Sequence, residues 1–145
     1  MFPLRLKNGD PPPIFEEAIS ELEKQKQRQA GRLSDSELKD KAGNITGRPG
    51  QRLITSTQYQ RNHHISEYAK RRANGICQLC KVDAPFKTKD NKPYLETHHI
   101  VWLAKGGSDT IDNTVALCPN CHRKVHHLET ISDLNTLKAA ANSDS

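Results

Sequence analysis

The chain is 145 residues long, with 34% hydrophobic residues, 27% charged residues and a formal net charge of +5. This is the size of one domain with an appendage, and a core of so low an apolar content usually needs a metal ion or a partner. The sequence has no transmembrane stretch and its first residues, MFPLRLKNGDPPP, do not resemble a secretion signal, so we expect a cytoplasmic protein.

Residues 1–50 are predicted to form a helical N-terminal extension or linker. The stretch IFEEAISELEKQKQRQAG, 14–31, carries a narrow apolar stripe, and its acidic and basic ends suit the helix dipole. The stretch LSDSELKDKAG, 33–43, carries a capping box of Ser34 and Glu37. Because narrow stripes rarely stabilise isolated helices, we expect these two to pack on the chain's own core, on a second copy or on a further domain.

Residues 51–130 are predicted to form the main domain, and residues 131–145 a weakly ordered tail. A helix is expected at about 57–74. It is followed by a strand that ends in two adjacent histidines, a glycine loop, a second short strand at TVALC and a last helix. This order of elements indicates a small domain of the α+β class.

Four cysteines form two Cys-x-x-Cys pairs that are separated by 37 residues: Cys77, Cys80, Cys118 and Cys121. Zinc prefers four ligands at the corners of a tetrahedron, and each tight Cys-x-x-Cys turn supplies two of them. A redox pair would instead require one motif at the start of a helix in a βαβ unit. We therefore predict a structural zinc ion, which four thiolates leave without an open position for catalysis.

The histidines form a second group of potential metal ligands. His122 and His126 lie four residues apart on the predicted helix, so they share one face and can bind one ion. His98 and His99 point to opposite faces of a strand. One of them can complete a three-histidine site, and the other would then be free to act as a general base. The alternative is that all four only support the zinc site.

Positive charge is concentrated around these motifs. Residues 51–127 contain twelve Lys and Arg against six Asp and Glu. This favours a polyanionic partner such as DNA, although charge alone describes a solvated basic surface equally well. The candidates for phosphate contacts are five basic residues: Arg71, Arg72, Lys105, Arg123 and Lys124.

The stretch LETHHIVWLAKGGSDTIDNTVALCPNCHRKVH, 95–126, resembles the HNH endonuclease family, which has a ββα-metal fold. The resemblance covers about 65–127, and ISEYAKRRANGICQLC is similar to the matching stretch of McrA-like members, which restrict DNA with modified bases. It implies that His99 is the general base, that Asn113 braces the loop and orients the base, and that His122 is a metal ligand.

A departure from the family pattern concerns the catalytic ion. His98 occupies a position that is often aspartate in this family. Together with His122 and His126 it resembles the three-histidine ligand set of the colicin nuclease domains. Aspartate would favour Mg²⁺, whereas three imidazoles suit Zn²⁺, Ni²⁺, Co²⁺ or Mn²⁺ better. The resemblance therefore implies one catalytic divalent cation and leaves its identity open.

The function that we predict is a metal-dependent HNH endonuclease that hydrolyses DNA, as the nuclease part of a restriction enzyme. Its expected partners are DNA, a second copy of the chain in a homodimer, and a recognition domain or subunit joined through residues 1–50. Two alternatives remain open. One is a small phage or mobile-element HNH nickase, and the other is a zinc module that binds DNA without cutting it.

Overall fold

The computed structural model describes residues 14–143, which divide into two compact units. The first unit extends to Gln58 and the second begins at Tyr59. The division lies after the predicted boundary at residue 50. The reason is that strand β1, Ile14–Phe15, pairs in parallel with strand β2, Ile54–Thr55, and so keeps that segment with the first unit.

The first unit contains the two predicted helices, α1 at Glu16–Gly31 and α2 at Asp35–Gly43. Ser34 caps α2 by accepting a hydrogen bond from the Glu37 N–H at 3.2 Å. In α1 Ile19 is buried, whereas Ala18 and Leu22 of the predicted apolar stripe are exposed.

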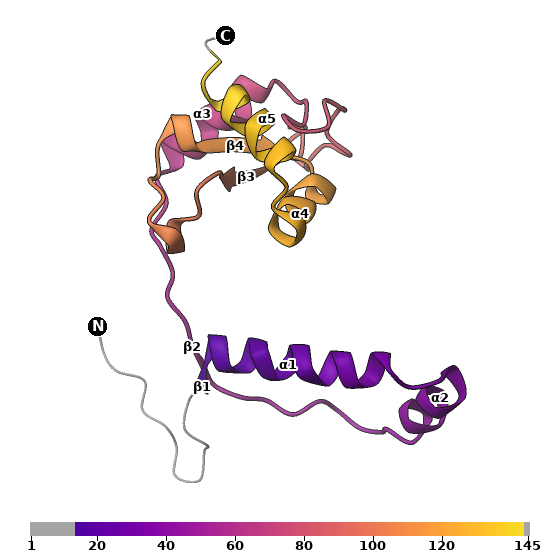
Figure 1. Ribbon diagram of the computed structural model, residues 1–145. Helices are drawn as coiled ribbons and strands as arrows, with labels where there is room; N and C mark the ends of the chain where they lie inside the picture. The colour runs from indigo at the N-terminus through magenta and orange to yellow at the C-terminus, as the bar shows by residue number, and fades with distance from the viewer. Residues whose placement is uncertain (1–13, 144–145) are drawn as a thin grey trace. The chain divides into compact units, whose positions relative to one another are not determined.

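The second unit is built on two antiparallel strands, β3 at Glu96–His99 and β4 at Thr114–Leu117, and on three helices. Helices α3 and α5 contact β4, and α4 contacts both strands (Figure 1). Short 3₁₀ turns occupy Leu103–Lys105 and Ile111–Asn113 in the long loop between the strands. The helices are α3 at His63–Ala73, α4 at Pro119–Leu128 and α5 at Ile131–Ala141.

Helix α3 begins later than the predicted residue 57. Asn62 caps it, because its side-chain oxygen accepts the His64 N–H at 2.8 Å. Ala69 and Ala73 form its buried side. None of the helices between residues 14 and 143 has both the length and the hydropathy that crossing a bilayer requires.

Residues 131–141 form a helix of the core, whereas the sequence predicted a weakly ordered tail. Leu137 and Ala141 of α5 are 1% and 4% exposed, and Thr130 caps the helix by accepting the Asp133 N–H at 3.3 Å. They pack with a cluster that includes Leu117 and Val125. The apolar spacing of α5 is too short to be distinctive in the sequence, and the helix is ordered by its contacts with β4 and with the 3₁₀ turn at Ile111–Asn113.

Candidate active site

The four cysteines lie together, with their sulfur atoms all within 4.8 Å of one another. Tetrahedral coordination with zinc–sulfur distances of about 2.3 Å would place the sulfurs about 3.8 Å apart, so the cluster has the size for one ion. Cys118 also caps α4, because its sulfur accepts the Cys121 N–H at 3.4 Å. No disulfide links the four residues.

The electrostatics of this cluster favour a cation. Burial raises the pKa of the Cys77 thiol, but backbone N–H groups around Cys118 and Cys80 outweigh it and lower the pKa to about 7. Burial raises the pKa of Cys121. Four thiolates at such short range repel one another, so a divalent cation is the group that allows all four to be deprotonated together.

The structure also brings His98, His122 and His126 together, with one ring nitrogen of each within 4.8 Å of the others. The Nε2 atoms of His122 and His126 are 3.1 Å apart. Two ligands at about 2.0–2.1 Å from a tetrahedral ion would be about 3.3–3.4 Å apart, so this pair has the spacing of a metal site. The donor set therefore fits a divalent transition metal.

Short local segments produce this geometry. Strand β4 pairs with β3, where His98 lies opposite Val115, and α4 begins two residues after β4 ends. The four-residue spacing on α4 then turns His122 and His126 toward the same strand. His98 is 5% exposed, and burial, followed by the charges of the other two histidines, lowers its pKa to about 3. At neutral pH His98 is therefore uncharged, as a histidine must be to bind a metal ion.

Glu96 supports this cluster, and the sequence analysis missed it. One of its carboxylate oxygens lies 2.9 Å from His122 Nδ1, and the other accepts the Tyr94 hydroxyl at 2.7 Å. The hydrogen bond from Tyr94, followed by the one from His122, lowers the pKa of Glu96. A carboxylate at Nδ1 leaves Nε2 as the free ligand atom. The alternation of residues 94, 96 and 98 along an extended segment was the signal in the sequence.

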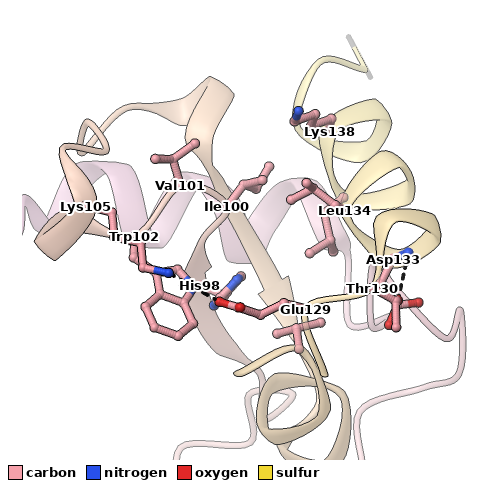
Figure 2. Close-up of a pocket in the computed structure, with 12 residues that line it drawn as sticks. His98, Ile100, Val101, Trp102, Lys105, Glu129, Thr130, Asp133, Leu134 and Lys138 are labelled. Atoms are coloured by element: carbon pink, nitrogen blue, oxygen red, sulfur yellow. Dashed lines mark hydrogen bonds and ion pairs between the residues drawn. The ribbon is translucent and has the colours of Figure 1, made fainter. Parts of the chain in front are cut away.

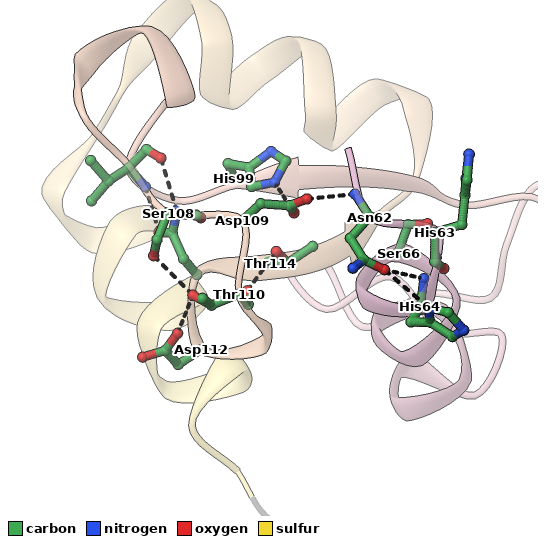
Figure 3. A network of polar contacts seen from close by, with 12 residues as sticks. Asn62, His63, His64, Ser66, His99, Ser108, Asp109, Thr110, Asp112 and Thr114 are labelled. Atoms are coloured by element: carbon green, nitrogen blue, oxygen red, sulfur yellow. Dashed lines mark hydrogen bonds and ion pairs between the residues drawn. The ribbon is translucent and has the colours of Figure 1, made fainter. Parts of the chain in front are cut away.

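His99 lies on the opposite face of β3 and pairs with Asp109, a second residue that the sequence analysis missed. His99 Nε2 is 2.9 Å from Asp109 Oδ1, and Asp109 Oδ2 accepts the backbone N–H of Asn62 at 2.7 Å (Figure 3). These bonds, that of Asn62 first, lower the pKa of Asp109 and keep it ionised. His99 is 7% exposed. A histidine oriented by a carboxylate is suited to act as a general base.

Asn113 closes the loop that carries Asp109. Its side-chain oxygen accepts the Val101 N–H at 2.9 Å, and its amide donates to the carbonyls of Val101 and Ser108 at 3.0 and 2.7 Å. A Cβ at Gly107 would lie 1.8 Å from the Val101 carbonyl oxygen, so this close approach requires glycine. The Asn113 side chain therefore braces the loop that carries Asp109, and its hydrogen bonds go to Val101 and Ser108 rather than to His99.

Arg72, a candidate phosphate contact, is turned inward. Its Nη1 donates to the Ala141 carbonyl at 2.9 Å, and its Nη2 donates to the Thr114 and Ile111 carbonyls at 2.7 and 3.1 Å. These bonds connect α3 with β4 and α5. Arg72 would have to leave these carbonyls to contact a phosphate.

Lys105 and Lys124, two further candidates, flank the corner between α4 and α5. Lys124 Nζ is 3.2 Å from the Asp133 carboxylate. Lys105 Nζ is 3.6 Å from Glu129 and 4.5 Å from the centre of the Trp102 ring. Each lysine would have to leave its carboxylate to contact DNA.

Arg71 and Arg123 are the more accessible candidates. The Arg71 side chain is 80% exposed, although its Nε is 3.1 Å from Glu67. Arg123 is exposed and next to His122, and it forms no ion pair within residues 14–143. Arg123 is therefore the candidate whose charge is free beside the cluster of His98, His122 and His126.

A cavity of about 320 Å³ adjoins His98 between the loop after β3 and the corner of α4 and α5 (Figure 2). Ile100 and Leu134 line its apolar part, and Glu129 and Lys138 line its polar part. The centre of the Trp102 ring on its wall lies 4.9 Å from the centre of the His126 ring.

Comparisons with known proteins find related sequences. Residues 77–128 match the family model described as HNH endonuclease. The chain is 45% identical over 76 residues to the type IV methyl-directed restriction enzyme EcoKMcrA of Escherichia coli, which covers 52% of this chain and 27% of the relative. It is 40% identical over 47 residues to the probable mobile endonuclease C of phage T4, covering 32% of this chain and 22% of the relative.

The chain thus spans about a quarter of the length of these two relatives. Among solved structures, the type IV phosphorothioation-dependent restriction endonuclease ScoMcrA matches with a TM-score of 0.48 and 32% identity, over 56% of this chain and 18% of that one. Residues 77–128, with their paired histidines and two cysteine pairs, are therefore similar to the HNH endonuclease family.

Proposed function

We propose that this chain is the nuclease part of a modification-dependent DNA restriction endonuclease. The observation that carries the proposal is the arrangement on β3, where His98 joins His122 and His126 on one face and His99 meets Asp109 on the other. The 45% identity of this chain, over 76 residues, to a methyl-directed restriction enzyme supports DNA as the substrate and modified bases as the signal.

His98, His122 and His126 would hold one divalent cation, and three imidazoles suit Zn²⁺, Ni²⁺, Co²⁺ or Mn²⁺ better than Mg²⁺. When bound, such an ion stabilises negative charge on the phosphate and on the leaving oxygen. The chain's own contribution would be of two kinds. Burial keeps His98 neutral, and the Glu96 carboxylate orients the ring of His122.

His99 would accept the proton of the attacking water. Asp109 engages Nε2, which leaves Nδ1 for the transfer, and the carboxylate stabilises the imidazolium that forms. The water attacks the phosphorus in line with the leaving 3′ oxygen. The products are a 5′-phosphate and a 3′-hydroxyl end, as the family resemblance implies.

The four cysteines would bind a structural zinc ion that connects the start of α4 to the segment after α3. Reduced thiols are required for this, which is why we place the protein in the cytoplasm. With no open coordination position, this ion stabilises the fold and takes no part in the reaction.

Cutting of both strands would need a second copy of the site. One site of this kind cuts one strand, so two copies related by a two-fold axis would match the antiparallel strands of a duplex. The exposed stripe of α1, where Leu22 is 43% exposed, would support such a homodimer or contact a recognition domain. Light scattering should find a dimer for the full chain and a monomer for Leu22→Asp; a monomer for both would argue against self-association.

A second candidate is a nicking enzyme of a mobile element. This candidate is favoured by the 40% identity to the probable mobile endonuclease C of phage T4, which extends over 47 residues, a third of this chain. A nickase would convert supercoiled plasmid to open circles and would produce no linear molecules.

Supercoiled plasmid, methylated or unmethylated, tests these proposals with the full chain and each of the five cations. We expect cation-dependent cutting that EDTA and His99→Ala abolish, that proceeds faster on methylated plasmid, and that the exposed-histidine control His63→Ala leaves unchanged. Equal rates on both plasmids would reject modification dependence but would leave the endonuclease proposal standing. DNA binding without cutting by any cation would identify a non-catalytic module.

A further inference from the structure

Residues 84–94, between the first cysteine pair and β3, form a narrow hairpin that we call the basic hairpin. The Tyr94 N–H donates to the Phe86 carbonyl at 2.9 Å, and the Thr88 N–H donates to the Lys92 carbonyl at 2.8 Å. An isolated bridge between residues 87 and 93 lies between these two bonds. The ladder gives the backbone of the hairpin one defined conformation.

An aromatic pair stands at the base of the basic hairpin. The rings of Phe86 and Tyr94 are stacked, with centroids 4.6 Å apart and planes inclined by 16°. Phe86 is nevertheless 54% exposed, so the stacking leaves more than half of it in water. Tyr94 supports one side of the Phe86 ring, and the remaining apolar surface is available to another flat group.

The aromatic pair lies on the same face as the three-histidine cluster. The Tyr94 hydroxyl donates to Glu96, and Glu96 contacts His122 at 2.9 Å. Residues 94, 96 and 98 alternate along an extended segment, so their side chains point to one side. At about 3.3 Å per residue, the four residue-to-residue steps from Tyr94 to His98 span about 13 Å. A substrate bound at the histidines would therefore extend past Phe86.

The charge of the basic hairpin indicates the kind of group that it meets. Its three lysines are exposed, and none of them forms an ion pair with any residue from 14 to 143: Lys87, Lys89 and Lys92. Asp90 is the one acidic residue of the hairpin sequence. An exposed aromatic ring among free lysines complements a nucleic acid, which offers stacked bases between phosphates. A protein partner with an apolar surface would not require this charge.

We propose that Phe86 is a wedge that enters between two stacked base pairs of the DNA beside the scissile phosphate, while the lysines of the basic hairpin contact the flanking phosphates. Apolar side chains that enter the minor groove in this way unstack a base step and bend the duplex. With base pairs spaced about 3.4 Å apart, the 13 Å span corresponds to about four steps from the cut. This inference rests on the proposed DNA endonuclease function.

A wedge has a consequence for the choice of cutting site. Pyrimidine–purine steps, above all TA and CA, unstack and kink more easily than other steps. Insertion of Phe86 should therefore favour cuts that have such a step at a constant offset of about two to five base pairs. Contacts to phosphates alone would produce no preference at that offset.

The experiment compares the cutting sites of four full-length proteins: wild type, Phe86→Leu, Phe86→Ala and Val82→Ala. Val82 is 62% exposed and precedes the basic hairpin, so it is a matched loss of apolar surface outside the wedge. Each protein is used to digest a random-sequence plasmid library partially, and the new ends are sequenced. Zinc content and circular dichroism are measured for every variant, and DNA binding for the wild type.

We expect an enrichment of at least about threefold for pyrimidine–purine steps at one offset for wild type, Phe86→Leu and Val82→Ala, and its loss in Phe86→Ala. A Phe86→Ala profile identical to that of a folded wild type would overturn the wedge while the endonuclease stands. An absence of cutting by wild type would reject the endonuclease and the wedge with it. If Val82→Ala also lost the enrichment, the effect would not belong to Phe86 and the wedge would be rejected.

Discussion

His99 Nε2 lies 2.9 Å from Oδ1 of Asp109, ten residues further along the chain and on the other side of the glycine loop. The second oxygen of the same carboxylate accepts the N–H of Asn62 at the start of α3. This one carboxylate therefore connects the candidate base to two different loops, and its effect can be separated from that of the metal ligands.

Asp109→Asn should reduce the rate of DNA cleavage by about 10²-fold or more, because general-base catalysis contributes about 10²–10⁴-fold and depends on the orientation of the base. The affinity for the catalytic cation, measured by calorimetry, should not change. Asp112→Asn is the matched control, since Asp112 lies in the same loop and contacts Thr110 rather than a histidine. Equal rates for the two variants would argue against a role for the His99–Asp109 pair.

Asn113→Ala should lower the free energy of unfolding by about 1–3 kcal/mol, because it leaves partly buried backbone groups of Val101 and Ser108 without their hydrogen bonds. Urea denaturation monitored by circular dichroism measures this change. Cleavage should fall as well, since the loop also positions Asp109. Wild-type stability of the variant would contradict the bracing role.

His126→Ala should lower the affinity for the catalytic cation by more than about 100-fold, because the loss of even an outer-shell partner of a metal ligand costs about 10–100-fold. His127→Ala is the natural control, as it removes the exposed neighbouring imidazole of the same helix and should leave the affinity unchanged. Calorimetric titration of Ni²⁺ or Co²⁺ into the zinc-loaded protein gives the dissociation constant of each variant. Similar constants would remove His126 from the ligand set.

Cys80→Ser should release the zinc ion and unfold or aggregate the second unit, because the energy of zinc binding is folding energy in so small a core. Zinc content by atomic emission and circular dichroism measure the two effects. A well-folded variant without zinc would show that the four cysteines are not a structural metal site.

Leu137→Ala should lower the free energy of unfolding by about 2–5 kcal/mol, the usual range for truncating a buried leucine. Ile131→Ala is the matched control on the same helix, because Ile131 is 76% exposed and its truncation should cost little. Denaturation curves with equal midpoints for both variants would mean that α5 is not part of the core.

The periodicity of short segments made part of the site predictable. Two residues between paired cysteines, three residues between His122 and His126, and adjacent positions for His98 and His99 each determine a relative direction through the geometry of a turn, a helix or a strand. The structure brings the cysteines into one cluster and His98, His122 and His126 into another. Which ions they bind, and that His99 is the base, remain predictions.

The tertiary structure alone decided which residues meet across the fold. The pairing of Asp109 with His99 depends on the path of an irregular loop, and the inward turn of Arg72 depends on carbonyls of β4 and α5. Neither contact follows from a regular spacing of residues, so no pattern in the sequence predicts it. The helix at 131–141 is stable because β4 offers a surface for Leu137, so its order is a property of that contact and not of its own residues.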